Sequence, residues 1–110
     1  MSRRMTSFKN MNEIRHMDTK DSYVIVLAKS KKNYSALSPD VPGCYTVGDT
    51  VEETLKHMRE ALAFHLEDED TMPEPRGLEY HLRHDEELRD DRFIFAYIPV
   101  SVVAPQMAHA

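Results

Sequence analysis

Cysteine is almost absent from this chain, and long apolar runs are missing. Cys44 is the single cysteine among 110 residues, so no disulfide can form within the chain. That composition suits a reducing compartment. No apolar run approaches the roughly 18 residues of a membrane span. Arg3 and Arg4 are not followed by an apolar core, which excludes a secretory signal. We therefore expect a cytoplasmic protein without a membrane partner.

Glycine is scarce too, and tryptophan is missing. With three glycines in the chain, no glycine-rich phosphate-binding motif can be assembled. Gly43 and Gly48 fall beside expected turns, where glycine permits tight backbone geometry. We therefore expect neither a nucleotide-binding loop nor a cofactor.

Acidic residues outnumber basic ones, and the formal net charge at pH 7 is −5. Residues 67–92 carry eleven acidic and four basic residues, a net charge of −7, whereas residues 1–21 carry +2. An acidic chain binds phosphate backbones poorly, but an acidic segment attracts a basic protein. A solvated face with no partner is the alternative interpretation.

The chain length fits one domain. We divide it into an N-terminal arm (1–21), a folded domain (22–103) and a C-terminal tail (104–110). The β-branched run after Ser22 predicts a strand over Ser22–Lys29 that is buried on both faces and hence central.

Two shorter strands are expected next, over Asn33–Ser38 and Cys44–Val47, and their short links favour an antiparallel meander. A helix should then begin at Thr50, because Thr50 and Glu53 fit a reciprocal capping box. It should end near Asp68, before two prolines. Its apolar stripe repeats with helical spacing at Val51, Leu55, Met58, Leu62 and Leu66.

A short helix is expected over the sheet rim within Gly77–Arg89, followed by a last strand over Phe93–Val103. Pro99 argues for an edge position of that strand. Its alternation places Ile94, Ala96, Ile98, Val100 and Val102 on one side and Phe93, Phe95 and Tyr97 on the other. A helix crossover would return this strand parallel to the first, with sheet order 3-2-1-4.

The ordered residues of 23–75 resemble the N-terminal domain of the HicB antitoxin family. The matching positions are Tyr23, Pro39, Asp40, Pro42, Gly43, Cys44, Gly48, Asp49, Thr50, Glu53, Ala61, Leu62, Pro73 and Pro75. The resemblance implies an α+β fold of order βββαβ, a partial ribonuclease H-like fold with one main helix on one face. We assign structural roles to Pro39, Pro42, Gly43, Gly48, Asp49, Thr50 and Glu53.

No residue set predicts catalysis or a metal site. A metal nuclease needs carboxylates clustered on strands, and the expected central strand has none. His81 and His84 are close enough in sequence to share a metal, but two ligands favour an exposed pair of histidines instead. Cys44 has no neighbouring cation to activate it, so a small buried residue is the preferred interpretation. We expect no enzyme.

The resemblance implies a domain that binds and occludes a small toxin that cleaves messenger RNA. An acidic surface would suit a toxin that must be basic to grip RNA. The candidate toxin-binding residues are Glu67, Asp68, Asp70, Asp85 and Glu86. The seven residues of 104–110 cannot build a DNA-binding unit, so DNA binding is doubtful.

The alternative is a homo-oligomeric interaction module with no toxin. The last strand is a long apolar edge, and proteins normally cover or pair such an edge. With no obvious helix to shield Phe93, Phe95 and Tyr97, these residues are the candidate interface of a homodimer. The alternative interpretation is that they pack against the N-terminal arm and the Glu74–Arg89 segment of the same chain.

Overall fold

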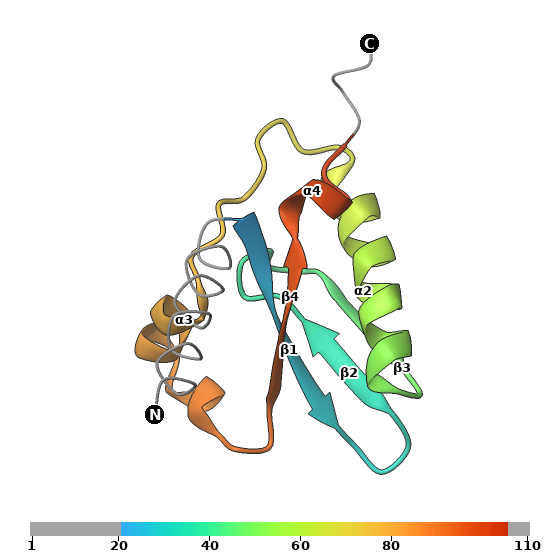
Figure 1. Cartoon of the computed structure of the whole chain (residues 1–110), viewed down its shortest axis with the longest axis vertical. Helices are drawn as coiled ribbons and strands as arrows, with labels where there is room; N and C mark the ends of the chain where they lie inside the picture. Colours follow the sequence, from blue (N-terminus) through green and yellow to red (C-terminus); the bar gives the residue numbers. More distant parts are fainter. Residues whose placement is uncertain (1–20, 106–110) are drawn as a thin grey trace, which may run out of the picture.

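The structure, a computed structural model, describes residues 21–105, which form a four-stranded sheet with helices on both faces (Figure 1). The elements in chain order are β1 (Ser22–Lys29), β2 (Tyr34–Leu37), β3 (Tyr45–Gly48), α2 (Val51–Leu66), α3 (Leu78–His84), the 3-10 helix η1 (Glu86–Arg89), β4 (Ile94–Pro99) and α4 (Val100–Val103). Apart from Asp21, Ala104 and Pro105, the expected arm and tail lie outside the described residues.

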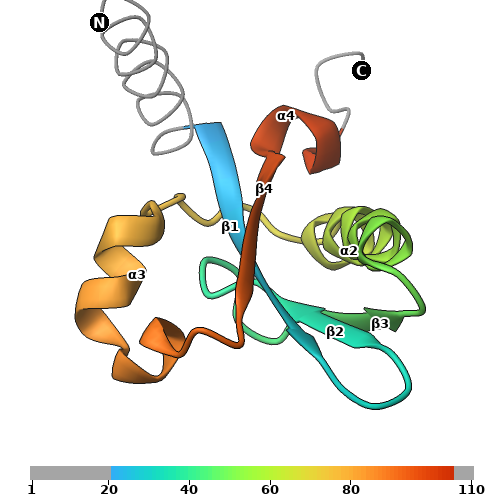
Figure 2. The ribbon, with the colours of Figure 1, turned by 60° about the horizontal axis from the view of Figure 1, so that its bottom comes forward.

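β1 is the central strand, as its sequence predicts. The sheet order is β3-β2-β1-β4, and β1, β2 and β3 form the expected antiparallel meander. The first six residues of β1 are buried, because α2 covers one face of the sheet and α3 with η1 covers part of the other (Figure 2). A strand covered on both sides needs the continuous apolar run that β1 carries.

The expected parallel pairing of the last strand with the first is wrong. β4 runs antiparallel to β1, with Val26 opposite Phe95 and Val24 opposite Tyr97. Residues 67–93 are the reason. They cross from the end of α2 to the opposite face, where α3 and η1 run back along the sheet before β4 starts (Figure 1). The rule that a crossover helix returns the next strand parallel to the first applies to a direct connection, and residues 67–93 are not one.

The last strand is also shorter than predicted, because β4 ends at Pro99. Proline has no N–H to continue a strand ladder, and the chain then coils into α4, where the N–H of Ala104 donates to the carbonyl oxygen of Val100 at 2.9 Å. Val103 is thereby buried in the core, while Val102 is 56% exposed. The predicted strand alternation thus fails after Pro99.

The start of α2 is capped by side chains, with one difference from the predicted capping box. Thr50 Oγ1 accepts a hydrogen bond from the N–H of Glu53 at 3.0 Å. Glu53 Oε1 accepts from the N–H of Asp49 at 2.7 Å rather than from Thr50. Both bonds satisfy backbone donors at the helix entrance.

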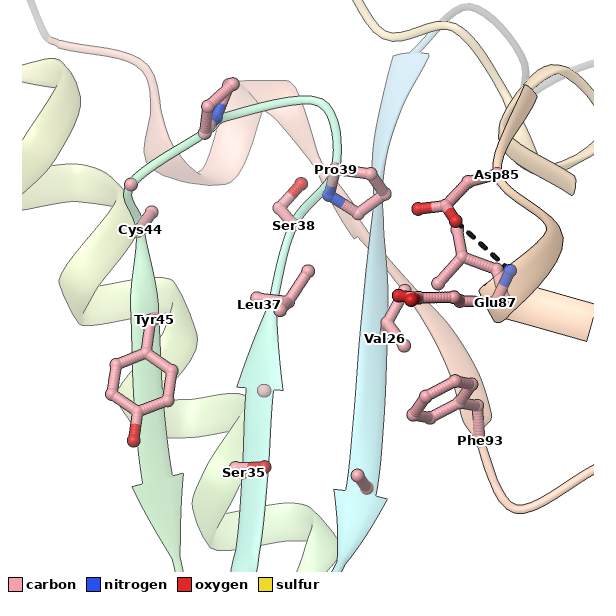
Figure 3. A pocket seen from close by; sticks show the side chains of 15 residues that line it. Val26, Ser35, Leu37, Ser38, Pro39, Cys44, Tyr45, Asp85, Glu87 and Phe93 are labelled. Atoms are coloured by element: carbon pink, nitrogen blue, oxygen red, sulfur yellow. Dashed lines mark hydrogen bonds between the residues drawn. The ribbon is translucent and has the colours of Figure 1, made fainter. Parts of the chain in front are cut away.

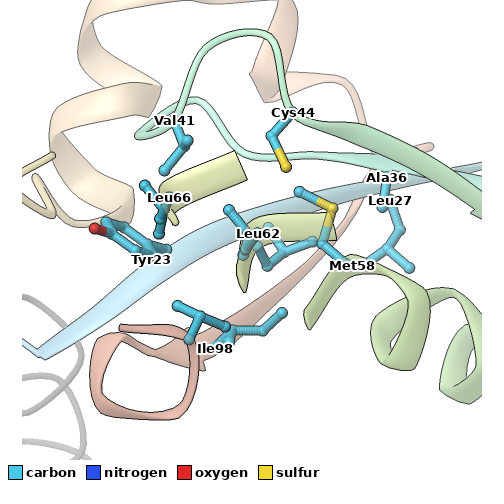
Figure 4. Close-up of a cluster of buried hydrophobic side chains, with 11 residues drawn as sticks. Tyr23, Leu27, Ala36, Val41, Cys44, Met58, Leu62, Leu66 and Ile98 are labelled. Atoms are coloured by element: carbon cyan, nitrogen blue, oxygen red, sulfur yellow. The ribbon is translucent and has the colours of Figure 1, made fainter. Parts of the chain in front are cut away.

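The main core lies between α2 and the sheet (Figure 4). Met58, Leu62 and Leu66 of the predicted stripe are fully buried, whereas Leu55 is half-buried. Thr54 is buried as well, and its hydroxyl donates to the carbonyl oxygen of Thr50 at 2.6 Å. Among the described residues, no helix is long and apolar enough to cross a membrane.

A second, smaller core lies on the other face of the sheet. Val24 and Val26 of β1 and Leu88 of η1 are its buried residues. The half-buried side chains packed around them are Leu78, Leu82, Phe93, Phe95 and Tyr97. This cluster attaches α3 and η1 to the half of the sheet formed by β1 and β4.

Candidate protein-binding groove

The proline loop between β2 and β3 is a pair of tight turns. The N–H of Val41 donates to the carbonyl oxygen of Ser38 at 3.1 Å, and the N–H of Cys44 donates to that of Val41 at 3.3 Å. Gly43 has a φ of +90°, a conformation that side chains other than glycine rarely adopt. This geometry accounts for the structural role assigned to Gly43.

Gly48 is required for a different reason, the close approach of β3 to α2. A Cβ atom at Gly48 would lie 2.6 Å from Thr54 Oγ1 and 2.8 Å from the Cα atom of Thr54. Thr54 sits in the first turn of α2 and cannot retreat without moving the helix. Gly48 thus lets the helix pack directly on the end of the strand.

Asp40 is the most extensively bonded side chain of the loop. Its carboxylate is fully buried and accepts three hydrogen bonds, from the N–H of Val24 at 2.8 Å, the N–H of Arg76 at 2.9 Å and Nε2 of His81 at 2.7 Å. A buried carboxylate is tolerated when its oxygens are satisfied in this way. Asp40 therefore joins the loop to β1 and to the entrance and body of α3.

Ser38 completes the connection to β1. Its hydroxyl donates to the carbonyl oxygen of Val24 at 2.8 Å, so Ser38 and Asp40 together satisfy both backbone groups of Val24. The β1–β2 pairing begins only at Val26, opposite Leu37. The two side chains thus continue the strand pairing beyond the end of β2.

Tyr23 lies beside this cluster, fully buried. Its hydroxyl donates to the carbonyl oxygen of Pro73 at 2.7 Å. Burial, with a smaller contribution from the negative charge of Asp40, raises the pKa of Tyr23 to about 12. The phenol is therefore a neutral hydrogen-bond donor that holds the loop after α2.

The two histidines of α3 do not form the exposed pair that the sequence suggests. His81 is buried and bonds to Asp40, whereas His84 faces outwards and stacks on Tyr80 with ring centroids 4.1 Å apart. The spacing of Leu78, His81 and Leu82 is a helical signal that could have placed His81 on the inner face. Its partner Asp40 is too distant in sequence for any local pattern to reveal.

Among the described residues, no group of three or more His, Cys, Asp or Glu side chains is arranged to hold a metal ion. Cys44 is buried in the main core, as the preferred sequence interpretation had it. Burial raises the pKa of the Cys44 thiol above its ordinary value. The thiol is therefore protonated and a poor nucleophile at neutral pH.

A groove of about 570 Å³ lies on the sheet face opposite α2 (Figure 3). The strand register places Tyr45, Leu37, Val26 and Phe95 in one row across that face. The smaller helices cover one half of the row, and the half on β2 and β3 stays open, with Leu37 45% and Tyr45 65% exposed. The groove floor is therefore apolar and reachable.

Acidic side chains form the far wall of the groove. Asp85 and Glu87 line it and point towards Pro39 and the floor (Figure 3). Asp85 Oδ1 also accepts from the N–H of Glu87 at 3.1 Å and so caps η1. Leu88 of the same turn is buried beneath. An apolar floor beside two carboxylates is a surface suited to a protein.

The five acidic residues singled out from the sequence do not form one patch. All five are exposed. Glu67, Asp68 and Asp70 follow the end of α2, whereas Asp85 links α3 to η1 and Glu86 begins η1. The helices α2 and α3 lie over opposite faces of the sheet (Figure 2). Glu87, which the sequence reasoning did not select, lines the groove instead of Glu86.

The aromatic face of β4 is shielded more than the sequence suggests. Phe93, Phe95 and Tyr97 are half-buried against Leu82 and Leu88 of the second core. α3 and η1 belong to the Glu74–Arg89 segment, so part of the alternative interpretation, packing against that segment, describes these side chains better than an unshielded face does. Among the described strands, β4 nevertheless pairs only with β1 and is an edge of the sheet.

The fold and the groove together define a small α+β domain with an open apolar groove on one face of its sheet. The chain belongs to the family described as HicB_like antitoxin of bacterial toxin-antitoxin systems, whose profile matches residues 23–109. Its four-stranded antiparallel sheet with helices is similar to known HicB antitoxin structures.

Particular relatives agree with that assignment. An uncharacterized 14.9 kDa protein of Haemophilus phage HP1 is 35% identical over 68 residues, which cover 58% of this chain and 51% of the phage protein. The crystal structure of antitoxin HicB3 is 25% identical, with a TM-score of 0.60, and covers 70% of this chain and 60% of that one. The chain therefore matches about half the length of the phage protein.

A further similar structure is that of a HicA3 and HicB3 toxin-antitoxin complex. The likeness has 25% identity and a TM-score of 0.55, and it covers 69% of this chain and 93% of that chain.

Proposed function

We propose that this domain binds a small basic toxin that cleaves messenger RNA and occludes it. Membership of the HicB-like antitoxin family over residues 23–109 is the observation that carries the proposal. The similar chain in a HicA3 and HicB3 toxin-antitoxin complex supports it.

The mechanism is occlusion rather than catalysis by this chain. The fully buried carboxylate of Asp40, in the loop between β2 and β3, is occupied by three hydrogen bonds within the protein. A toxin that grips RNA needs a positive surface for the phosphates, and an acidic partner can cover that surface. The candidate contacts are exposed and form two separate groups, which are alternative sites for the toxin: Glu67, Asp68 and Asp70 after α2, and Asp85 and Glu86 at η1.

The test is a search beside the gene of this chain for a reading frame that encodes a short basic protein, followed by co-expression of the two. We expect the two proteins to co-purify, and we expect the purified toxin to degrade RNA only until this domain is added. A neighbouring protein that neither binds this chain nor loses its activity would contradict the proposal.

The same assay checks that the domain is not itself a nuclease. Alone with Mg²⁺ or Mn²⁺, it should leave RNA intact, because the described residues bring no group of metal ligands together. Metal-dependent cleavage that persists through purification and disappears in the Asp40→Asn or Asp49→Asn variant would show the opposite.

A homo-oligomeric module without a toxin is the second candidate. The observation that favours it is the position of β4 at the sheet edge, with backbone groups on one side unpaired by any described strand. Two copies could pair along β4 around a two-fold axis, with Phe93, Phe95 and Tyr97 nearby. A stable dimer and no co-purifying toxin would favour this function over the first.

A further inference from the structure

On the sheet face opposite α2, the half formed by β2 and β3 exposes more apolar surface than is usual for a small protein. Leu37, Tyr45 and Val47 are large apolar residues of β2 and β3, and each is exposed by 41% or more. They continue directly into the apolar floor of the groove at Val26 and Phe93. A contiguous apolar surface rimmed by polar groups is typical of an interaction site.

The charge beside this surface is one-sided. Residues 85–92 carry five acidic and two basic residues, a net charge of −3. Arg92 is paired with Asp90, with Nη2 of Arg92 3.0 Å from Oδ2 of Asp90. The pKa of Asp90 is lowered by the hydrogen bonds from Arg92. Asp85 and Glu87, by contrast, have no ion-pair partner among the described residues and point into the groove (Figure 3).

The groove is preformed rather than dependent on its occupant. Pro39 is held on one side by the bonds of Ser38 and Asp40 to β1. On the other side, η1 is held by the Asp85 cap and by burial of Leu88. The Asp40–His81 bond connects the two walls. Preformed surfaces lose little ordering entropy on binding.

We propose that this groove is the docking site for a basic partner protein, which inserts a bulky apolar side chain flanked by lysine or arginine. The apolar side chain would lie on Leu37, Tyr45 and Phe93, and the cation would meet Asp85 and Glu87. A few anchor side chains buried in well-packed pockets carry most of the energy of an interface. The inference rests on the proposed function in naming the toxin as the partner.

Matched variants separate the groove from the other acidic site. Asp85→Asn with Glu87→Gln removes two negative charges from the groove wall, and asparagine retains the capping ability of Asp85. Glu67→Gln with Asp70→Asn removes the same two charges after α2. Leu37→Ser in the groove is matched by Phe64→Ser on α2, where Phe64 is 78% exposed. Thermal unfolding confirms that each variant is folded.

The first measurement uses a short synthetic peptide in which leucine and tryptophan are flanked by lysines. The chain contains no tryptophan, so peptide fluorescence reports binding directly. We expect saturable binding with a Kd below about 1 mM. The double variant Asp85→Asn with Glu87→Gln should weaken peptide binding about tenfold, and so should Leu37→Ser. The matched variants on and after α2 should weaken it by less than about twofold.

Nuclear magnetic resonance of the wild-type protein locates the peptide without any variant. Shifts confined to β2, β3 and η1 would support the proposal. Three results would overturn the proposal: no binding of the peptide, shifts centred on residues 67–70, or equal weakening of binding by the two double charge variants. A dimer that Leu37→Ser dissociates would also overturn it, because a second copy would then be the occupant.

The same variants with the co-purified toxin distinguish the two proposals. Loss of toxin binding in the groove variants alone would support both. Normal toxin binding by the groove variants would overturn the groove as the docking site and leave the proposed function standing. If wild-type protein captures no toxin, the proposed function fails, and the peptide measurements still decide the groove.

Discussion

Asp40 shows how one side chain can organise several segments of a small domain. Its carboxylate accepts hydrogen bonds from Val24, Arg76 and His81, residues that lie 16, 36 and 41 positions away in sequence. The side chain of Asp40 is fully buried and that of His81 is 10% exposed. Removing one partner from such a cluster leaves buried donors unsatisfied, and that costs more than an exposed bond would.

We predict that Asp40→Asn lowers the free energy of unfolding by about 2–4 kcal/mol, since the asparagine NH₂ group would face an N–H donor. Urea unfolding measures the change. Asp68→Asn, at an exposed position, is the matched control and should change it by less than about 0.5 kcal/mol. Equal midpoints for both variants would contradict the role given to Asp40.

Tyr23 gives the fold a dependence on alkaline pH. Its pKa is about 12 in the folded protein against an ordinary value of 10.0. Between these values the unfolded chain loses the phenol proton first, so the folded state binds more protons. The stabilisation by Tyr23 is therefore complete below pH 10 and is lost as pH rises towards 12.

Absorbance titration of the tyrosine phenolates tests the raised pKa of Tyr23. We expect one late transition near pH 12, and its disappearance in Tyr23→Phe. The same substitution should cost about 0.5–1.5 kcal/mol at neutral pH through the lost bond to Pro73. A late transition that survives in Tyr23→Phe would assign the shifted pKa to another tyrosine.

At the scale of elements, α2 is where local sequence and packing agree most closely. Its cap at Thr50 and its stripe through Met58 and Leu62 follow from spacing and residue type, and it ends at Leu66, two residues before the expected Asp68. The structure differs only in how deeply two residues of the helix are buried, because Thr54 is buried while Leu55 of the predicted stripe is half-buried.

We predict that Leu62→Ala costs about 2–5 kcal/mol, because the side chain is fully buried. Leu55→Ala should cost less, about 1–2 kcal/mol, since part of its area stays in water. Thr50→Ala should cost about 1 kcal/mol through the lost cap. Urea midpoints rank the three, and a larger loss for Leu55 than for Leu62 would contradict this packing.

The α3–η1 segment illustrates what a local pattern cannot convey. The sequence predicts a short helix over the rim, and α3 and η1 form there. Which face they cover depends on the path of residues 67–77 and on the bond of His81 to Asp40. That placement reverses the direction of β4 and creates the acidic wall of the groove.

At the scale of the whole molecule, helices cover one sheet face fully and the other in part. The edge strand β4 and the open surface of β2 and β3 are what remains for partners. We predict that the protein forms a dimer by pairing along β4 in sedimentation equilibrium. Ile94→Lys, at a residue 40% exposed on β4, should then yield monomers, because two like charges would meet near the two-fold axis.

Tyr97→Asp should also yield monomer or insoluble protein, since an unpaired charge in a partly buried site is costly. Tyr97 packs in the second core as well, so Ile94→Lys is the cleaner probe. Val102→Lys, at an exposed position in α4, is the matched control. A monomeric wild type, or a dimer unaffected by Ile94→Lys, would exclude β4 as the interface.

By itself, the sequence determined the four strands and α2, their order, the central place of β1 and the helix cap, because these depend on periodicity and on neighbours a few residues apart. It did not predict α4, which replaces the end of the expected last strand. Only the tertiary structure decided the direction of β4, the Asp40–His81 bond and the groove between η1 and β2. These features depend on the path of a long connection and on side chains that meet only when distant segments pack. Hydrophobic spacing describes which face of a segment is buried, but it does not describe which segment covers that face.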